Sequence, residues 1–485
     1  MTTPQESRDR RWTALILLCV AQFVVVLDAS IVNVALPSIG KGLHFSNQNL
    51  PWVVNAYVIT FGGFLLLGGR AADLLGRRRV FMAGLVVVAV ASLAAGFAAT
   101  QGQLIAARAA QGLGAAIISP AALSIVTSLF SDGAERNKAL GAWGAVAGSA
   151  GAVGVLLGGV LTDGLGWQWV LWVNVPVSLI ALAFTPGLIA ESRSDSATRH
   201  FDVTGAIGVT AGLSVLAYAL LDAGSAGWGS VKIVSLLAVA VLLLAGFVVT
   251  ELRSAAPLVP FRIFRLRTLT GANVVGILLG ASLFSMFFFI SLYMQQVLGY
   301  SPIHAGLSYL PLAVTIIIAA GVGGQLVTRF GFKPILAAGM VFVGLGLAWF
   351  SRVSVGGSFA ADILGPSVLA AIGLGFGFVT STIAAVSGIR DREQGLASGL
   401  INTSQQIGGA LGLAVLSTIA TTRTHHLLAN GSPGRSALTS GFHAAFLGGS
   451  VIAVLGVLAA LILIRTRDSR AHVEMANADP APVTA

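Results

Sequence analysis

One carboxylate lies well inside an apolar segment of this sequence. Asp28 falls within the run from Trp12 to Leu36, which contains no other acidic side chain. An ionisable side chain in the middle of a membrane helix costs about 2.5–3.5 kcal/mol on insertion scales, and such residues are usually functional. A carboxyl group that alternates between its charged and neutral forms could carry protons, so Asp28 is the first candidate for chemistry.

A second ionisable residue, Arg108, lies in a later apolar run at a similar depth. At about 1.5 Å per helical residue, Asp28 is about 12 Å and Arg108 about 8 Å from the same end of their runs. Pairing with a cation keeps a desolvated carboxylate ionised, and disturbing the pair lets it bind a proton. We therefore expect Asp28 and Arg108 to be the proton-coupling pair. A purely structural ion pair is the alternative.

A short polar segment, GGRAADLLGRRR at positions 68–79, combines one acid with several arginines and glycines. Anchoring at the cytoplasmic surface of a membrane would explain the arginines. It does not explain Asp73, which is flanked by glycines on a tight loop. The candidate gating loop consists of Gly69, Asp73, Gly76, Arg77 and Arg78.

Aromatic and amide side chains on four apolar runs could face a central substrate cavity, although helix packing is the more common role for any one of them. These candidates are Trp52, Asn55, Tyr57, Gln111, Trp143, Asn402, Gln405 and Gln406. No GxxxxGK[ST] phosphate loop occurs, and His, Cys and carboxylates do not cluster at one depth. We expect no catalytic residues, no metal, no cofactor and no use of ATP.

Membrane helices must position these residues. The 485 residues are 56% hydrophobic and 9% charged, and their mean hydropathy is +0.89, whereas soluble domains carry about 25% charged residues. In hydrocarbon the backbone must bond internally, so runs of about 20 apolar residues predict spanning helices of an all-α membrane protein. The fourteen predicted spans are 13–36, 51–69, 80–99, 103–128, 139–162, 168–189, 203–222, 231–250, 270–295, 303–328, 334–351, 360–386, 399–420 and 442–464. The longest outer loop is then 421–441.

The distribution of basic residues supports an even number of spans, because Lys and Arg are retained on the cytoplasmic side. With the N-terminus inside, 22 of the 28 Lys and Arg residues lie in inner loops and tails, and five lie in outer loops. A missed span would reverse this bias for the rest of the chain. We expect both termini to be cytoplasmic, and we attribute the net charge of +10 to this topology rather than to nucleic-acid binding.

An internal repeat divides the spans into two halves. Gly69, Asp73, Gly76 and Arg78 recur 255 residues later as Gly324, Thr328, Gly331 and Lys333. The repeat unit is eight spans, so two spans are inserted between two six-helix bundles, and parallel repeats of this kind are typical of transporters. The predicted divisions are a cytoplasmic tail at 1–12, an N-terminal bundle at 13–189, an inserted helix pair with flanking loops at 190–269, a C-terminal bundle at 270–465 and a disordered cytoplasmic tail at 466–485.

Four segments resemble motifs of the fourteen-helix drug:proton antiporters of the major facilitator superfamily. LDASIVNVALP (27–37) is similar to their first-helix signature, with Asp28 at the acidic position. The segment 69–79 resembles the loop motif between helices 2 and 3. The segment RAAQGLGAA (108–116) resembles the helix 4 motif with its arginine, and GWQWVLWVNVP (166–176) resembles the start of helix 6. Helix 5 departs from the family pattern, since Val155 stands where proline is usual.

The resemblance implies the major facilitator fold and a proton-coupled efflux transporter for hydrophobic or amphipathic small molecules. It also implies that loop 69–79 is a latch that closes the inner face by pairing with a neighbouring helix end. The expected partners are a drug or secondary metabolite, protons and the lipid of the plasma membrane; a monomer is expected. A nutrient facilitator or importer on the same fold remains an alternative, and a membrane-embedded receptor or enzyme is a less favoured one.

Overall fold

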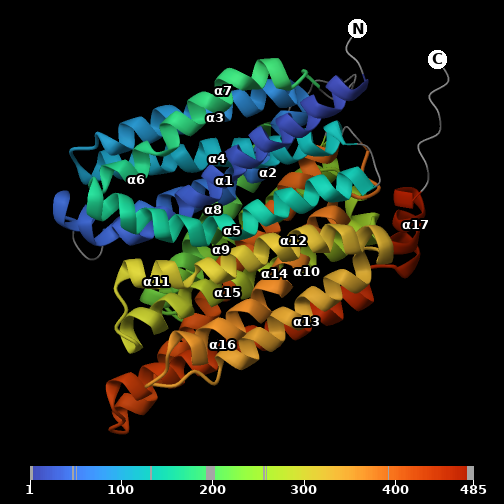
Figure 1. The fold of residues 1–485 in the computed structure, drawn as a ribbon. Coiled ribbons are helices and arrows are strands. Elements are labelled where there is room, and N and C mark those ends of the chain that lie inside the picture. The colour runs from blue at the N-terminus through green and yellow to red at the C-terminus, as the bar shows by residue number, and fades with distance from the viewer. Residues whose placement is uncertain are drawn as a thin grey trace.

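The computed structural model describes residues 4–45, 49–50, 52–130, 134–192, 203–254, 257, 259–390 and 393–477, and this part of the chain is helical throughout, without strands. The helices run lengthwise beside one another (Figure 1). The first bundle consists of α1 (Pro4–Gly42), α2 (Trp52–Leu75), α3 (Arg77–Gly96), α4 (Gln101–Leu129), α5 (Ala134–Gly164), α6 (Gln168–Trp172) and α7 (Asn174–Leu188).

Two helices, α8 (Val203–Ala226) and α9 (Val231–Arg253), follow the first bundle and pack against each other. The second bundle consists of η1 (Phe261–Arg265), α10 (Arg267–Leu292), η2 (Tyr293–Val297), α11 (Pro302–Ser308), α12 (Leu310–Phe330), α13 (Phe332–Phe350), η3 (Phe359–Leu364), α14 (Gly365–Val386), α15 (Gln394–Ala429) and α16 (Gly434–Leu463). A final helix, α17 (Thr466–Asn477), lies at the same end of the molecule as the start of α1 (Figure 1).

The two bundles repeat one packing scheme. Helix α1 packs on α5 as α10 packs on α15, and α4 packs on α2 and α3 as α14 packs on α12 and α13. Between the bundles, α2 contacts α15 and α5 contacts α12, which are again equivalent pairs. This symmetry is what the 255-residue repeat in the sequence predicts.

The repeated glycines have the same structural role in both halves. Gly76 precedes α3 with φ of 107° and Gly331 precedes α13 with φ of 81°. These are left-handed conformations that favour glycine. Each allows an abrupt turn between two antiparallel helices. The backbone thus explains why glycine recurs at this point of the repeat.

Eleven helices in the described part of the chain are long and apolar enough to cross a membrane, and α5 makes twelve if its bent halves are one span. The sequence predicted fourteen. Two of the predicted spans correspond to helices that are not long and apolar enough by this criterion. They are α8, whose described apolar part is Thr204–Leu220, and α15, which carries more polar residues. Large apolar side chains on the outward faces, such as Val241, Phe184 and Ile462, are exposed as a lipid-facing surface requires.

Helix α5 bends by 43° between Gly151 and Val153. Sharp helix bends are almost always caused by proline or by small flexible residues. Val155 occupies the position where the family has proline, so proline does not cause this bend. Glycine supplies the flexibility instead, because Gly151 and Gly154 border the bend.

At three boundaries the helices extend beyond the predicted spans. The first helix begins at Pro4, so most of the predicted tail 1–12 is helical. Helices α15 and α16 extend to Ala429 and from Gly434, which reduces the predicted loop 421–441 to four residues. Nothing in the predicted span lengths excluded these extensions, because a helix can continue beyond the apolar segment with polar side chains.

Residues 466–477 of the tail predicted to be disordered form α17, which is a docked amphipathic helix. Ser469 Oγ accepts a hydrogen bond from the backbone N–H of Lys333 at 3.1 Å. His472 is buried, contacts Asn137 of α5 at 3.1 Å and stands edge-on to Phe332 at 5.5 Å.

Candidate functional site

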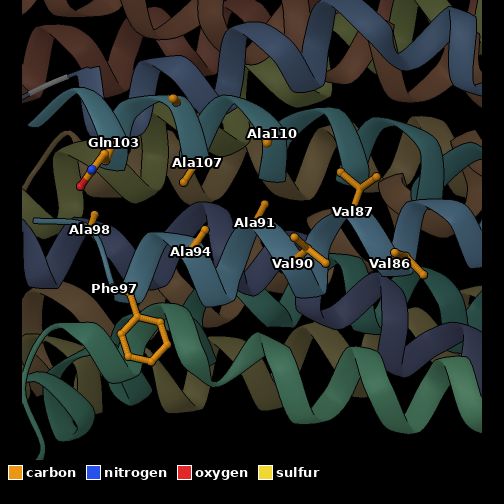
Figure 2. A pocket seen from close by; sticks show the side chains of 11 residues that line it. Val86, Val87, Val90, Ala91, Ala94, Phe97, Ala98, Gln103, Ala107 and Ala110 are labelled. Atoms are coloured by element: carbon orange, nitrogen blue, oxygen red, sulfur yellow. The ribbon is translucent and has the colours of Figure 1, made fainter. Parts of the chain in front are cut away.

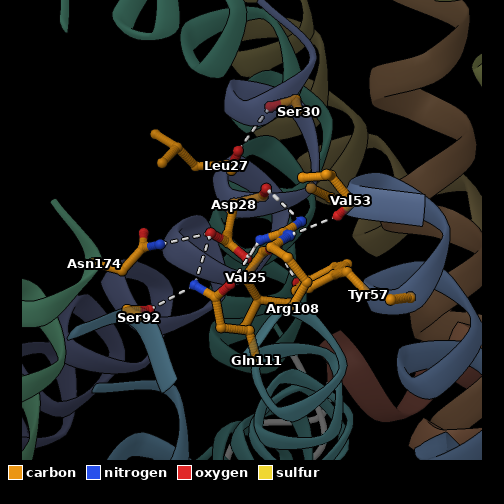
Figure 3. A network of polar contacts seen from close by, with 12 residues as sticks. Val25, Leu27, Asp28, Ser30, Val53, Tyr57, Ser92, Arg108, Gln111 and Asn174 are labelled. Atoms are coloured by element: carbon orange, nitrogen blue, oxygen red, sulfur yellow. Dashed lines mark hydrogen bonds and ion pairs between the residues drawn. The ribbon is translucent and has the colours of Figure 1, made fainter. Parts of the chain in front are cut away.

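The Asp28 carboxylate is the centre of a buried polar cluster inside the first bundle (Figure 3). Arg108 NH1 of α4 lies 2.6 Å from Oδ2, so the ion pair expected from the depth of the two residues is present. Oδ1 accepts hydrogen bonds from Asn174 Nδ2 of α7 at 2.6 Å and from Gln111 Nε2 of α4 at 3.3 Å. Asp28 is 2% exposed and Arg108 is 0% exposed.

The guanidinium of Arg108 is held from several sides. Its Nε donates to the carbonyl oxygen of Val53 at 2.9 Å, and its plane lies over the ring of Tyr57, with 4.5 Å between the guanidinium carbon and the ring centroid. The Tyr57 hydroxyl in turn donates to the carbonyl oxygen of Val25 at 2.8 Å. Helices α1, α2 and α4 therefore meet at one charge pair, and any change in the charge of Asp28 acts on all three.

Three residues of this cluster were not among the sequence candidates. Asn174 donates to Asp28, Val53 accepts from Arg108, and Ser92 of α3 accepts from Gln111 Nε2 at 2.7 Å. Val53 acts through its backbone and Ser92 is an ordinary helix serine, so neither had a signal. Asn174 did have one, because it lies within the aromatic segment 166–176 that resembles the start of helix 6 in the antiporters.

The candidate substrate residues do not gather at one place. Tyr57 and Gln111 belong to the Asp28 cluster, whereas Trp52 stacks on Tyr218 of α8 with ring centroids 5.4 Å apart. Trp143 is 3% exposed within the hydrophobic core. The other four are partly exposed; they are Asn55, Asn402, Gln405 and Gln406. Their role in a substrate cavity remains a prediction.

An apolar groove lies elsewhere in the first bundle. It has a volume of about 750 Å³ and runs between α3 and α4. Figure 2 shows valine and alanine side chains along it, with Phe97 and Gln103 near one end. Val86 and Val90 in its lining are 44% and 62% exposed, so the groove belongs to the lipid-facing surface rather than to the charge pair.

Asp73 of the predicted gating loop connects the two bundles. Its Oδ1 and Oδ2 accept the backbone N–H groups of Gly395 and Leu396 at 3.1 Å each, in the first turn of α15. Glu393, which precedes α15, makes no side-chain cap of its own, so Asp73 serves as the cap from the other bundle. Arg77 NH2 pairs with Asp73 at 3.3 Å. The helix-end contact that a latch requires is present, and its role in gating stays a prediction.

Neighbouring side chains extend this contact, which we call the latch and define as Asp73, Arg77 and the first turn of α15. Thr127 of α4 donates to Gln394 Oε1 at 2.8 Å, and Arg77 donates to Ser128 Oγ. Gly69 lies so close to Gly395 that a side chain at either position would meet the other backbone. The close approach of α2 and α15 therefore depends on glycine at both positions.

The other two arginines at the end of the predicted loop have a different partner. Arg78 and Arg79 donate their backbone N–H groups to the Glu191 carboxylate at 3.1 and 3.2 Å, and Arg78 Nε lies 3.8 Å from it. Glu191 thus caps the start of α3 within the first bundle. The candidate gating loop therefore divides into a part that crosses between the bundles and a part that does not.

We expect Asp73→Ala to loosen the latch. Losing a cap costs about 1 kcal/mol, and losing hydrogen bonds to a charged group about 1.5–3 kcal/mol. A cysteine at Thr127, in a Cys19→Ala background that has no other thiol, should then react with a maleimide about tenfold faster. Glu191→Gln is the control, because its contacts stay within one bundle. Equal rates in the Asp73→Ala variant and its parent would contradict this prediction.

The family model described as Major Facilitator Superfamily matches residues 18–413. The chain is 42% identical to the cephamycin export protein CmcT of Amycolatopsis lactamdurans, over 90% of this chain and 89% of that protein. It is 38% identical to the puromycin resistance protein pur8 of Streptomyces alboniger, over 89% and 86% of the two chains. It is 32% identical to the multidrug transporter MdtP of Bacillus subtilis, over 88% and 79%.

Solved structures show the same fold at low sequence identity. The human organic anion transporter MFSD10 superposes with a TM-score of 0.65 at 14% identity, covering 95% of this chain and all of that one. The proton:xylose symporter XylE superposes with a TM-score of 0.63 at 12% identity, covering 93% and 95%. With a family model across most of its length and relatives above 30% identity, this chain is a multi-pass membrane protein of the major facilitator superfamily.

Proposed function

We propose that this protein exports hydrophobic or amphipathic small molecules, such as antibiotics or secondary metabolites, in exchange for protons. The observation that carries the proposal is the buried ion pair between Asp28 and Arg108, 2.6 Å apart. A charge pair at this depth is costly to bury, and it is useful where one partner must change its charge during a cycle. Relatives named for cephamycin export, puromycin resistance and multidrug transport support the choice of substrate class and direction.

The geometry supports a physical route from the proton to the opening of the protein. Protonation of Asp28 leaves the Arg108 charge without its counter-ion, held by Gln111, by the Tyr57 ring and by the backbone carbonyl oxygens of Val53 and Asp28. An uncompensated buried charge favours rearrangement of the helices around it. Helix α2 carries Val53 and Tyr57 near one end and Asp73 near the other, roughly 25–30 Å away at about 1.5 Å per residue. A shift of α2 at the charge pair thus reaches the latch.

We further propose that α8 and α15 also cross the bilayer, which gives fourteen spans with both termini in the cytoplasm of a plasma-membrane protein. The bundles 13–189 and 270–465 would then rock about a substrate site between them, with the pair in 190–269 inserted. Because the latch holds α2 against α15, we propose that it closes the cytoplasmic side. The protein is expected to work as a monomer.

This topology can be tested with single cysteines in the Cys19→Ala background. Gly229 lies between α8 and α9, and Gly102 lies at the start of α4. Both glycines are exposed and have free space around them. Cysteines at both positions should react with an impermeant maleimide applied to intact cells. A cysteine at Arg470, exposed on α17, should react only after permeabilisation. Protection of Gly229→Cys in intact cells would show that α8 does not cross the bilayer, and the number of spans would then be lower than fourteen.

The proposed direction and substrate class are tested together with an antibiotic susceptibility panel in cells with and without the gene. We expect the gene to raise the inhibitory concentration of at least one lipophilic antibiotic. Accumulation of that compound should fall in intact cells and recover when the proton gradient is collapsed. Gradient-dependent accumulation instead of exclusion would favour the alternative, a nutrient importer on the same fold.

A further inference from the structure

The hydrogen bonds around Asp28 fit only one of its two protonation states. Among the described residues, three side chains reach the carboxylate and all are donors: Arg108 Nη1, Gln111 Nε2 and Asn174 Nδ2. An ionised carboxylate accepts at both oxygens and donates nothing, so this arrangement suits the charged form. A protonated Asp28 adds one O–H donor to the cluster. A buried donor without an acceptor is costly, so the protonated form requires a change in one of these neighbours.

Only one neighbour is able to make this change. Arg108 has no acceptor. The Gln111 amide is fixed in its orientation, because its Oε1 accepts from Arg108 at 2.9 Å while its Nε2 donates to Ser92 at 2.7 Å. The Tyr57 hydroxyl is bonded to the carbonyl oxygen of Val25. The Oδ1 atom of Asn174 is different: it is buried and accepts no hydrogen bond from any described residue.

The position of Asn174 allows its amide to turn over. It is the first residue of α7, directly after the break from α6 at Val173. A half-turn about its Cβ–Cγ bond would direct Oδ1 towards Asp28 and Nδ2 away from it. Ser178 lies one helical turn further along the same face of α7, and its Oγ is also buried without a partner among the described residues. The turned-over amide would therefore find an acceptor for its N–H.

We propose that Asn174 is a positioning residue whose amide donates to ionised Asp28 and turns over to accept the hydrogen bond of protonated Asp28. This inference rests on the proposed function, in which Asp28 carries the proton. The charged and titratable groups that face Asp28 in the described structure are Arg108 of α4 and Tyr57 of α2, while α3 and α7 contribute the neutral groups Ser92 and Asn174. One neutral amide can thus pair with Asp28 in both of its charge states.

The test is an infrared difference spectrum of the full-length protein in lipid, between high and low pH. Wild type should show the C=O band of a protonated carboxylic acid that is missing in Asp28→Asn. In Asn174→Leu, which has similar bulk and no polar group, this band should move to higher frequency because the acid has lost its acceptor. Asn174→Ser, whose hydroxyl can donate or accept, should keep a band near the wild-type position.

Matched controls separate this role from a purely structural one. Asn33→Leu removes an amide whose hydrogen bond in the described structure is to its own helix, at the carbonyl oxygen of Ala29, and should leave the band unchanged. Proton-driven transport by Asn174→Leu should fall about tenfold, the size of one lost hydrogen bond, with substrate binding retained. An unchanged band in Asn174→Leu would overturn the role of Asn174 and leave that of Asp28 intact. If wild type shows no band that depends on Asp28, the proton-carrier role in the proposed function fails first, and this inference fails with it.

Discussion

Asp28→Asn is expected to abolish proton-driven efflux while leaving the protein inserted in the membrane and able to bind substrate. Asparagine keeps the shape of the side chain and can still accept hydrogen bonds, but it cannot exchange a proton. It therefore imitates protonated Asp28, a state that the proposed transport cycle requires. The remaining contacts of Arg108 with Val53, Gln111 and Tyr57 hold its charge in both proteins. The fold should thus tolerate the substitution, while substrate transport should no longer be coupled to proton transport.

The size of the expected loss follows from the driving force. An elementary charge gains about 2.3 kcal/mol per 100 mV, so a proton-motive force of roughly 150 mV supplies about 3.4 kcal/mol per proton. At about 1.4 kcal/mol for each factor of ten, one proton exchanged for one neutral substrate sustains a gradient on the order of 300-fold. Asp28→Asn should reduce this gradient to about onefold, which means equilibration or no transport.

The measurement is substrate accumulation in proteoliposomes with an imposed pH gradient. Asp222→Asn is the matched control, because Asp222 pairs with Lys232 at 2.7 Å near the connection between α8 and α9, away from the charge pair of the first bundle. It should transport as wild type does. If Asp28→Asn still concentrates substrate, the proton carrier must be sought elsewhere. Asp362 is then a poor substitute, since it accepts the backbone N–H groups of Ser354 and Ser358 at an exposed helix start.

Charge and periodicity predicted the parts of the molecule that involve large free energies. A lone acid and a lone arginine at similar depth can avoid isolation in hydrocarbon only by pairing, and Asp28 and Arg108 do pair. The glycines of the repeat had to mark a turn, and Gly76 and Gly331 have the positive φ values that such a turn requires. In both cases other arrangements of these residues would be strongly unfavourable in free energy, so the sequence alone was enough to predict the observed one.

Neutral polar residues were much harder to assign from the sequence. Asn174, Asn402 and Gln405 look alike as amides on apolar helices, yet Asn174 bonds Asp28 while Asn402 bonds the backbone of its own helix. The direction of such a side chain depends on helix rotation and on small differences in packing energy. The sequence also did not predict where α8 and α9 pack, so nothing indicated that Trp52 would stack on Tyr218 of α8.

Arg108→Leu should abolish transport at every pH and should make stability depend on pH. Without its cation, buried Asp28 can avoid an uncompensated charge only by keeping a proton, so it cannot release one. The folded variant then binds more protons than its unfolded chain, in which the carboxyl group ionises freely. Stability therefore falls as pH rises. Breaking a buried ion pair by removing one partner costs about 3–5 kcal/mol, so we expect the free energy of unfolding to fall by about this amount at high pH.

The double variant Asp28→Asn with Arg108→Leu separates the charge effect from simple loss of packing. It has no charged side chain left at this site, and replacing both members of a buried pair is often close to neutral for stability. We expect its thermal unfolding in detergent to be nearly independent of pH between about 5 and 8, whereas Arg108→Leu alone should unfold at lower temperature at the higher pH. Both proteins should be inactive in the pH-gradient assay. If the double variant were as unstable as Arg108→Leu at high pH, Arg108 would be important for packing rather than as the counter-ion of Asp28, and the coupling route through α2 would lose its starting point.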